Sequence, residues 1–187
     1  MRAHFAFLLT LTALAALPVR AALPAPAHSL AETLKGECVV AVGQSRNPPQ
    51  EAKVDATRDK LAEILLSGFS QGLQEAGATV VARFYPTSAD DLNALKAREL
   101  ESFAKTQGCK WLAQLATVIS KDQKLSVSVS LSPVLLEGPQ KDKLRIGALA
   151  YGRNWNYALS QKFMDEFKPL EAARGYARDL LASKPAH

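Results

Sequence analysis

Apolar and serine residues alternate strictly between Lys124 and Pro133, and this is the clearest pattern along the chain. A repeat of two residues places successive side chains on opposite faces of a β-strand. We therefore expect a strand with one buried face and one face in water, as in an antiparallel sheet. The apolar positions are Leu125, Val127, Val129 and Leu131, and the polar positions are Ser126, Ser128, Ser130 and Ser132.

Other apolar segments predict the remaining elements. Short apolar runs predict strands over residues 38–42, 78–85, 110–120 and 144–150. Apolar residues three and four positions apart predict helices over residues 55–76, 88–107, 155–167 and 169–182. Gly77 suits the left-handed position just after the first of these helices, and Pro169 suits the first turn of the last one.

This order, β-α-β-α-β-β-β-α-α, predicts an α/β fold: a mixed five-stranded sheet with helices packed on it. Its first part favours parallel strands joined by right-handed crossovers, and its second part favours an antiparallel meander. We assign residues 36–183 to a single domain, the Ala- and Pro-rich residues 22–35 to a flexible lead-in, and residues 184–187 to a tail.

The first 21 residues have the parts of an export signal. Arg2 supplies a positive start, and the apolar run over residues 5–17 is too short to span a bilayer as a helix. Val19 and Ala21 place small residues at the expected cleavage site. We therefore expect cleavage after Ala21, a bacterial periplasmic location and no integral membrane segment in the mature chain. No cysteine lies near that site, so a lipid anchor is not expected.

The charge of the chain gives little support to nucleic-acid binding. The formal net charge is +5, and loss of Arg2 and Arg20 with the signal would leave +3. The basic residues are spread from Lys35 to Lys184 instead of forming a patch. Nucleic acid is therefore not an expected partner.

Cys38 and Cys109 are the two cysteines of the chain. Disulfides persist in exported proteins, and one pair allows one intramolecular connectivity. If the first and third strands are neighbours, both cysteines begin strands at the same edge of the sheet, which favours a disulfide. In the chain-entropy model, closing a loop of about 70 residues stabilises the fold by roughly 4 kcal/mol. A metal site or redox centre is the alternative, but neither a nearby His nor a Cys-x-x-Cys pair supports it.

Two helix-to-strand transitions resemble those of known periplasmic domains. One is the helix over residues 61–73 that leads into residues 77–83 (GATVVAR), and the other is the segment 104–112 (AKTQGCKWL). Over about residues 37–135 the layout resembles the N-terminal part of TolB, the lipoprotein activators of penicillin-binding proteins and the curli secretion subunit CsgG. The resemblance implies a domain that binds envelope partners without catalytic residues. The chain lacks the activators' lipid-accepting cysteine and TolB's propeller.

The sequence offers no clear catalytic group. The histidines are His4, His28 and His187, in the signal and the expected tails, so Ser–His–Asp or Cys–His catalysis has no imidazole in the domain. Acid–base catalysis by two carboxylates is an alternative, but the close pairs lie on predicted helices among polar neighbours. We expect no catalytic residue, metal or cofactor. The pairs are Asp90 with Asp91, Glu99 with Glu101, and Asp165 with Glu166.

An aromatic segment is the first candidate binding site. If it is extended, Tyr151, Arg153, Trp155 and Tyr157 project to one face. Tyr, Trp and Arg are over-represented in interface hot spots, which suggests a partner-binding strip. The alternative is a satellite of the core beneath the terminal helices.

The loop after the first strand, residues 43–49, is the second candidate. Open α/β sheets often bind ligands at this edge, and Ser45 with Arg46 could hold an anion there. A plain strand-to-helix loop is the alternative. The leading hypothesis is a non-catalytic exported protein that binds a cell-envelope component, either a protein or a glycan. A periplasmic carrier or sensor of a small ligand and a carboxylate-dependent hydrolase are the alternatives.

Overall fold

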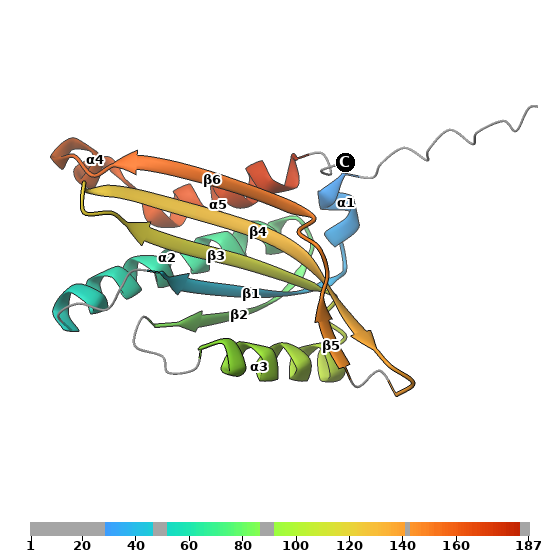
Figure 1. Cartoon of the computed structure of the whole chain (residues 1–187). Coiled ribbons are helices and arrows are strands. Elements are labelled where there is room, and N and C mark those ends of the chain that lie inside the picture. Colours follow the sequence, from blue (N-terminus) through green and yellow to red (C-terminus); the bar gives the residue numbers. More distant parts are fainter. Residues whose placement is uncertain (1–28, 47–51, 87–91, 141–142, 184–187) are drawn as a thin grey trace, which may run out of the picture.

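The computed structural model describes residues 29–46, 52–86, 92–140 and 143–183, and shows a six-stranded mixed sheet with helices on both faces (Figure 1). The helices are α1 (Leu30–Leu34), α2 (Ala52–Glu75), α3 (Leu92–Gln107), α4 (Gln161–Glu166) and α5 (Pro169–Leu181). The strands are β1 (Cys38–Ser45), β2 (Thr79–Tyr85), β3 (Trp111–Ile119), β4 (Lys124–Glu137), β5 (Lys143–Ile146) and β6 (Tyr151–Ala158).

The sheet has the order β2-β1-β3-β4, and both β5 and β6 pair with β4. Strand β1 runs parallel to β2 and β3, whereas β4 runs antiparallel to β3. The long strand β4 pairs with β6 along residues 124–131 and with β5 along residues 134–137. The α/β class, the mixed sheet and the packing of helices on it are as predicted.

The C-terminal half of the sheet differs from the prediction. The strand predicted over 144–150 ends at Ile146 as β5, and an additional strand that was not predicted, β6, returns to pair with β4. The helix predicted over 155–167 is therefore wrong at its start, and the sheet has six strands instead of five. Trp155, Leu159 and Phe163 are four residues apart and mimic a helical stripe. A helix begins only after Ser160, whose side chain accepts the Phe163 N–H at 3.1 Å.

Part of the predicted flexible lead-in is a helix. Ser29 caps α1 by accepting the Glu32 N–H, and the Glu32 side chain accepts the Ser29 N–H in return. Leu30 and Leu34 are fully buried in the core. Residues 29–34 therefore belong to the folded domain.

Helices α2 and α5 pack on one face of the sheet and on each other (Figure 1). Two glycines of α2 allow this close approach. A Cβ at Gly68 would overlap the carbonyl oxygen of Leu170, and one at Gly72 would lie 2.5 Å from the Cβ of Ala177. The core on this face includes Leu65, Phe69 and Leu73 of α2, Tyr176 and Leu180 of α5, and Leu125, Val127, Val129 and Leu131 of β4.

Helix α3 covers only part of the opposite face. Its Leu100 and Phe103 pack against Val40 of β1 and Leu112 of β3. This second cluster also reaches Val134 in the half of β4 that pairs with β5. It includes none of the serines at positions 126 to 132, so the other half of this face is left without this apolar cover.

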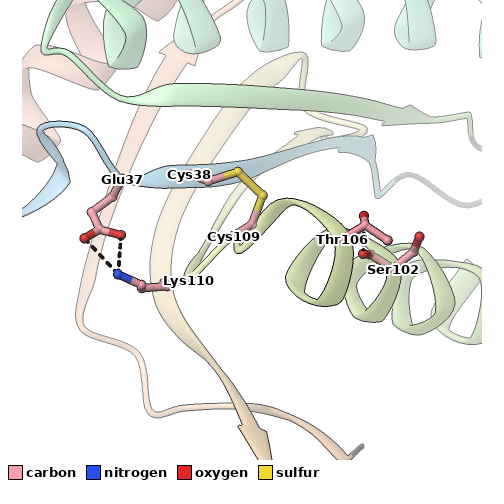
Figure 2. The surroundings of a disulfide bond; sticks show 6 residues. All are labelled: Glu37, Cys38, Ser102, Thr106, Cys109 and Lys110. Atoms are coloured by element: carbon pink, nitrogen blue, oxygen red, sulfur yellow. Dashed lines mark hydrogen bonds and ion pairs between the residues drawn. A yellow bond between two sulfur atoms is a disulfide. The ribbon is translucent and has the colours of Figure 1, made fainter. Parts of the chain in front are cut away.

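The predicted disulfide between Cys38 and Cys109 is present (Figure 2). It joins the start of β1 to the segment between α3 and β3, and it spans 71 residues of sequence. Lys110 and Glu37 form an ion pair beside it at 3.0 Å. The disulfide therefore fixes the C-terminal end of α3 to the sheet.

We expect Gly68→Ala to lower the free energy of unfolding by about 1–3 kcal/mol, because the added methyl group must push α2 away from α5. Gly175→Ala in α5 is the matched control, since a Cβ there meets nothing within 4 Å. That variant should gain up to about 1 kcal/mol from helix propensity. Chemical denaturation measures both, and a Gly68→Ala variant as stable as the original chain would contradict the close packing.

Candidate binding face

The uncovered half of the second face is lined by short polar side chains from β3, β4 and β6, and we call it the serine face. The side chains of this face form rows across the sheet, and the pairing of the strands determines which residues share a row. Ser128 lies opposite Ala116 on one side and Asn154 on the other, and Ser130 lies opposite Gln114 and Gly152. Ser126 lies opposite Val118 and Asn156. The apolar residues Leu125, Val127, Val129 and Leu131 of β4 face α2 and α5, and Ser126, Ser128 and Ser130 lie partly exposed on the other face, as predicted. Ser132 differs from the prediction, because it is buried, at 7% exposure.

A hollow of about 470 Å³ opens on the serine face. This volume lies in the range of small-molecule sites. Its lining includes Arg46, Gln114, Ser128, Ser130, Leu149 and Asn154. Among the described residues that line it there is no Asp or Glu, so its charged groups are positive.

Arg46 of the predicted ligand loop borders this hollow, whereas Ser45 does not. The Arg46 N–H donates to the Thr117 carbonyl at 2.8 Å, which holds the end of β1 beside β3. Ser45 is buried, at 7% exposure. Successive residues of a strand point to opposite faces, so the structure separates the two residues that the sequence grouped. Residues 47–49 of the predicted loop lie outside the described part.

Leu149 forms an apolar rim on the other side of the hollow. Its side chain is 59% exposed. A Cβ at Gly152 would lie 3.3 Å from Leu149 Cδ2, so the missing side chain leaves room for the leucine above β6. The hollow therefore has a cationic border and an apolar border.

The polar groups between these borders have unused hydrogen-bonding capacity. Arg46, Gln114, Ser130 and Asn154 make no side-chain hydrogen bond or ion pair to another described residue. Ser128 Oγ reaches the Ala116 carbonyl only at 3.5 Å. By contrast, Ser126 Oγ donates to Asn156 Oδ1 at 2.7 Å, outside the hollow. The side chains of the hollow are therefore free to bind a polar ligand.

The predicted aromatic strip lies on the opposite side of β6, toward α5. Trp155 packs against Tyr176 with ring centroids 4.3 Å apart. Tyr157 accepts a hydrogen bond from Tyr176 at 2.9 Å and stacks on Phe163. Burial and this hydrogen bond raise the pKa of Tyr176 well above its usual range.

Tyr151 also packs partly buried against this core cluster. Arg153 is exposed, and its Nε donates to Ser183 Oγ just after α5. The rings therefore form a satellite of the core instead of an open binding strip.

The two carboxylates of the predicted Glu99–Glu101 pair have different partners. Glu99 accepts a hydrogen bond from Tyr85 and lies 3.9 Å from Arg83, whereas Glu101 pairs with Lys105. Burial and the hydrogen bond to Glu99 raise the pKa of Tyr85 well above the usual range of a tyrosine.

Asp165 accepts a hydrogen bond from Gln161 on exposed α4, and Asp90 and Asp91 lie outside the described residues. In the described ranges, no three His, Cys, Asp or Glu side chains gather as a metal site would require.

The sequence predicted some of the residues that line the hollow, but not all of them. The serine alternation identified the wet face of β4, and the position after β1 identified Arg46. Asn154 was overlooked because the aromatic residues beside it dominated that segment. Gln114 and Leu149 carried no sequence signal.

No helix in the described part of the chain has the length and apolar character needed to cross a membrane. No protein-family model and no curated protein matches the sequence.

Solved structures that the chain matches in a structural comparison include lipoprotein GNA1162 from Neisseria meningitidis, at 11% identity and TM-score 0.41, over 67% of this chain and 82% of that one. The PelC dodecamer from Paraburkholderia phytofirmans is 13% identical at TM-score 0.36, over 85% and 94% of the two chains. A homologue of the neuraminyllactose-binding hemagglutinin from Helicobacter pylori is 8% identical at TM-score 0.32, over 79% of this chain and 88% of that one. These values are too low to transfer a function.

We expect Trp155→Ala to lower the free energy of unfolding by about 3 kcal/mol, because the ring leaves a cavity against Tyr176. Asn154→Ala, on the serine face of the same strand, should change it by less than about 0.5 kcal/mol. Denaturant titration of both variants tests the assignment. If the two variants were equally stable, the assignment of Trp155 to the core would be wrong.

Proposed function

We propose that this chain is an exported, non-catalytic protein that binds another component of the cell envelope through its serine face. One observation carries the proposal: α2 and α5 cover one face of the sheet, whereas the polar half of the other face holds a hollow with unused hydrogen-bonding groups. A side-chain surface of this kind can recognise a polar partner without any catalytic group.

Export is supported by three features. The first 21 residues have the pattern of a signal peptide. The Cys38–Cys109 disulfide suits an oxidising compartment such as the periplasm. The resemblance to TolB, the penicillin-binding-protein activators and CsgG, which we retain as part of the proposal, also favours a periplasmic binding domain.

A small-ligand carrier or sensor is the second candidate. The hollow of about 470 Å³ and the cation at Arg46 favour it. In that case the partner would be a free molecule that enters the hollow, and the rest of the serine face would stay in water. The structure gives the carboxylate-dependent hydrolase no support at Glu99 and Glu101, because the two carboxylates bind different partners.

Site-specific photo-crosslinking in cells of the source organism tests the proposal. A crosslinker at Ser128 should give an adduct of discrete mass, whereas one at Lys60 on α2 should not. Lys60 is a matched control because its side chain is 69% exposed and lies on a helix. The mass of the purified chain should correspond to a start at Ala22.

Two results would contradict this account. The absence of an adduct at Ser128, or the same adduct from both positions, would reject binding through the serine face. A chain that keeps residues 1–21 and stays in the cytoplasm would reject export.

A further inference from the structure

We propose that the hollow beside Arg46 binds an acidic saccharide, that is, a sugar that carries a carboxylate. This inference rests on the proposed function, because it names the class of component that the serine face recognises.

The charge of the hollow favours one anionic group. Arg46 is exposed at its border and forms no ion pair with another described residue. Arg153 also borders the hollow, but its side chain lies on the opposite face of β6, where its Nε donates to Ser183 Oγ. A guanidinium presents parallel N–H groups that match the two oxygens of a carboxylate. Arg46 is therefore the group that would hold the acid.

The neutral polar side chains of the hollow favour a ligand that carries hydroxyl groups next to its carboxylate. Ser, Asn and Gln side chains can each donate and accept hydrogen bonds, as the hydroxyl groups of a sugar also can. Ser128 and Asn154 form one row across the sheet, and Gln114 and Ser130 form the next. Two residues along a strand span about 7 Å, which is close to the width of a sugar ring. The hollow thus offers two rows of complementary groups to one ring.

The apolar rim fits the C–H surface of a sugar. Leu149 is 59% exposed beside Gly152, at the β6 end of the row that contains Gln114 and Ser130, and it lines the hollow. Among the described lining residues there is no aromatic ring, so a nucleotide base or another flat aromatic ligand would find no stacking surface. A carboxylate, several hydroxyls and a small apolar patch are together the features of an acidic sugar.

NMR titration of the mature protein tests the inference, with D-glucuronate as the probe and D-glucose and inorganic phosphate as matched controls. Glucuronate should shift the amide signals of residues 128–130 and 152–154 and bind at least tenfold more tightly than glucose or phosphate. Raising the salt concentration should weaken this binding, because the ion pair at Arg46 is exposed.

Two variants test whether Arg46 binds the carboxylate of glucuronate. Arg46→Gln should weaken glucuronate binding at least tenfold and leave the melting temperature unchanged, since Arg46 lies outside both core clusters. Arg174→Gln is the control, because Arg174 pairs with Glu75 on the α2–α5 face. It should leave glucuronate binding unchanged.

The outcomes separate this inference from the proposed function. If glucose binds as tightly as glucuronate, the hollow does not recognise a carboxylate, and the inference is wrong. If phosphate binds as tightly as glucuronate, the hollow does not recognise a sugar, and the inference is also wrong. Absence of binding by all three probes overturns the inference. If a crosslinker at Ser128 still captures a protein, the proposed function stands with a protein partner, and if it captures nothing, both fail.

Discussion

The close packing of α2 against α5 is the constraint on which the rest of the structure depends. Gly68 and Gly72 remove the side chains that would keep the two helices apart, so both fit on one face of the sheet. Leu125, Val127, Val129 and Leu131 of β4 are buried beneath them, and the rings of β6 are partly buried there. Among the helices of the described residues, α3 alone packs on the opposite face, and its cluster reaches Val40, Leu112 and Val134 but none of the serines of β4. The open serine face follows from this uneven distribution of helices.

The boundary of the covered region can be followed along individual strands. On β3, Leu112 packs under α3, and two residues later on the same face Gln114 lines the hollow. On β4, Val134 belongs to the α3 cluster, whereas Ser130 belongs to the hollow. The disulfide holds α3 over the covered end. On both strands, therefore, one part packs in the core under α3, and another part of the same strand lines the proposed binding site.

Local patterns predicted the fold well where one face of an element is buried. The alternation in β4, the glycine that ends the first long helix and the disulfide all follow from the sequence and are present. Gly77, for example, adopts a positive φ. The start of the last strand was missed because apolar residues four apart after Trp155 also suit a helix. The hollow was only partly predictable, since Gln114, Leu149 and Asn154 come together through pairing between distant strands, which no local pattern records.

The central claim is that the serine face is covered by a partner in the cell, and thiol labelling tests it most directly. A single reactive cysteine introduced by Ser130→Cys, with Cys38 and Cys109 held in their disulfide, should react fast with a small maleimide in the purified protein. The account predicts much slower labelling of the same cysteine in the intact envelope, while a Lys60→Cys control on α2 reacts equally in both. Equal labelling of the Ser130→Cys variant in the two settings would contradict the account.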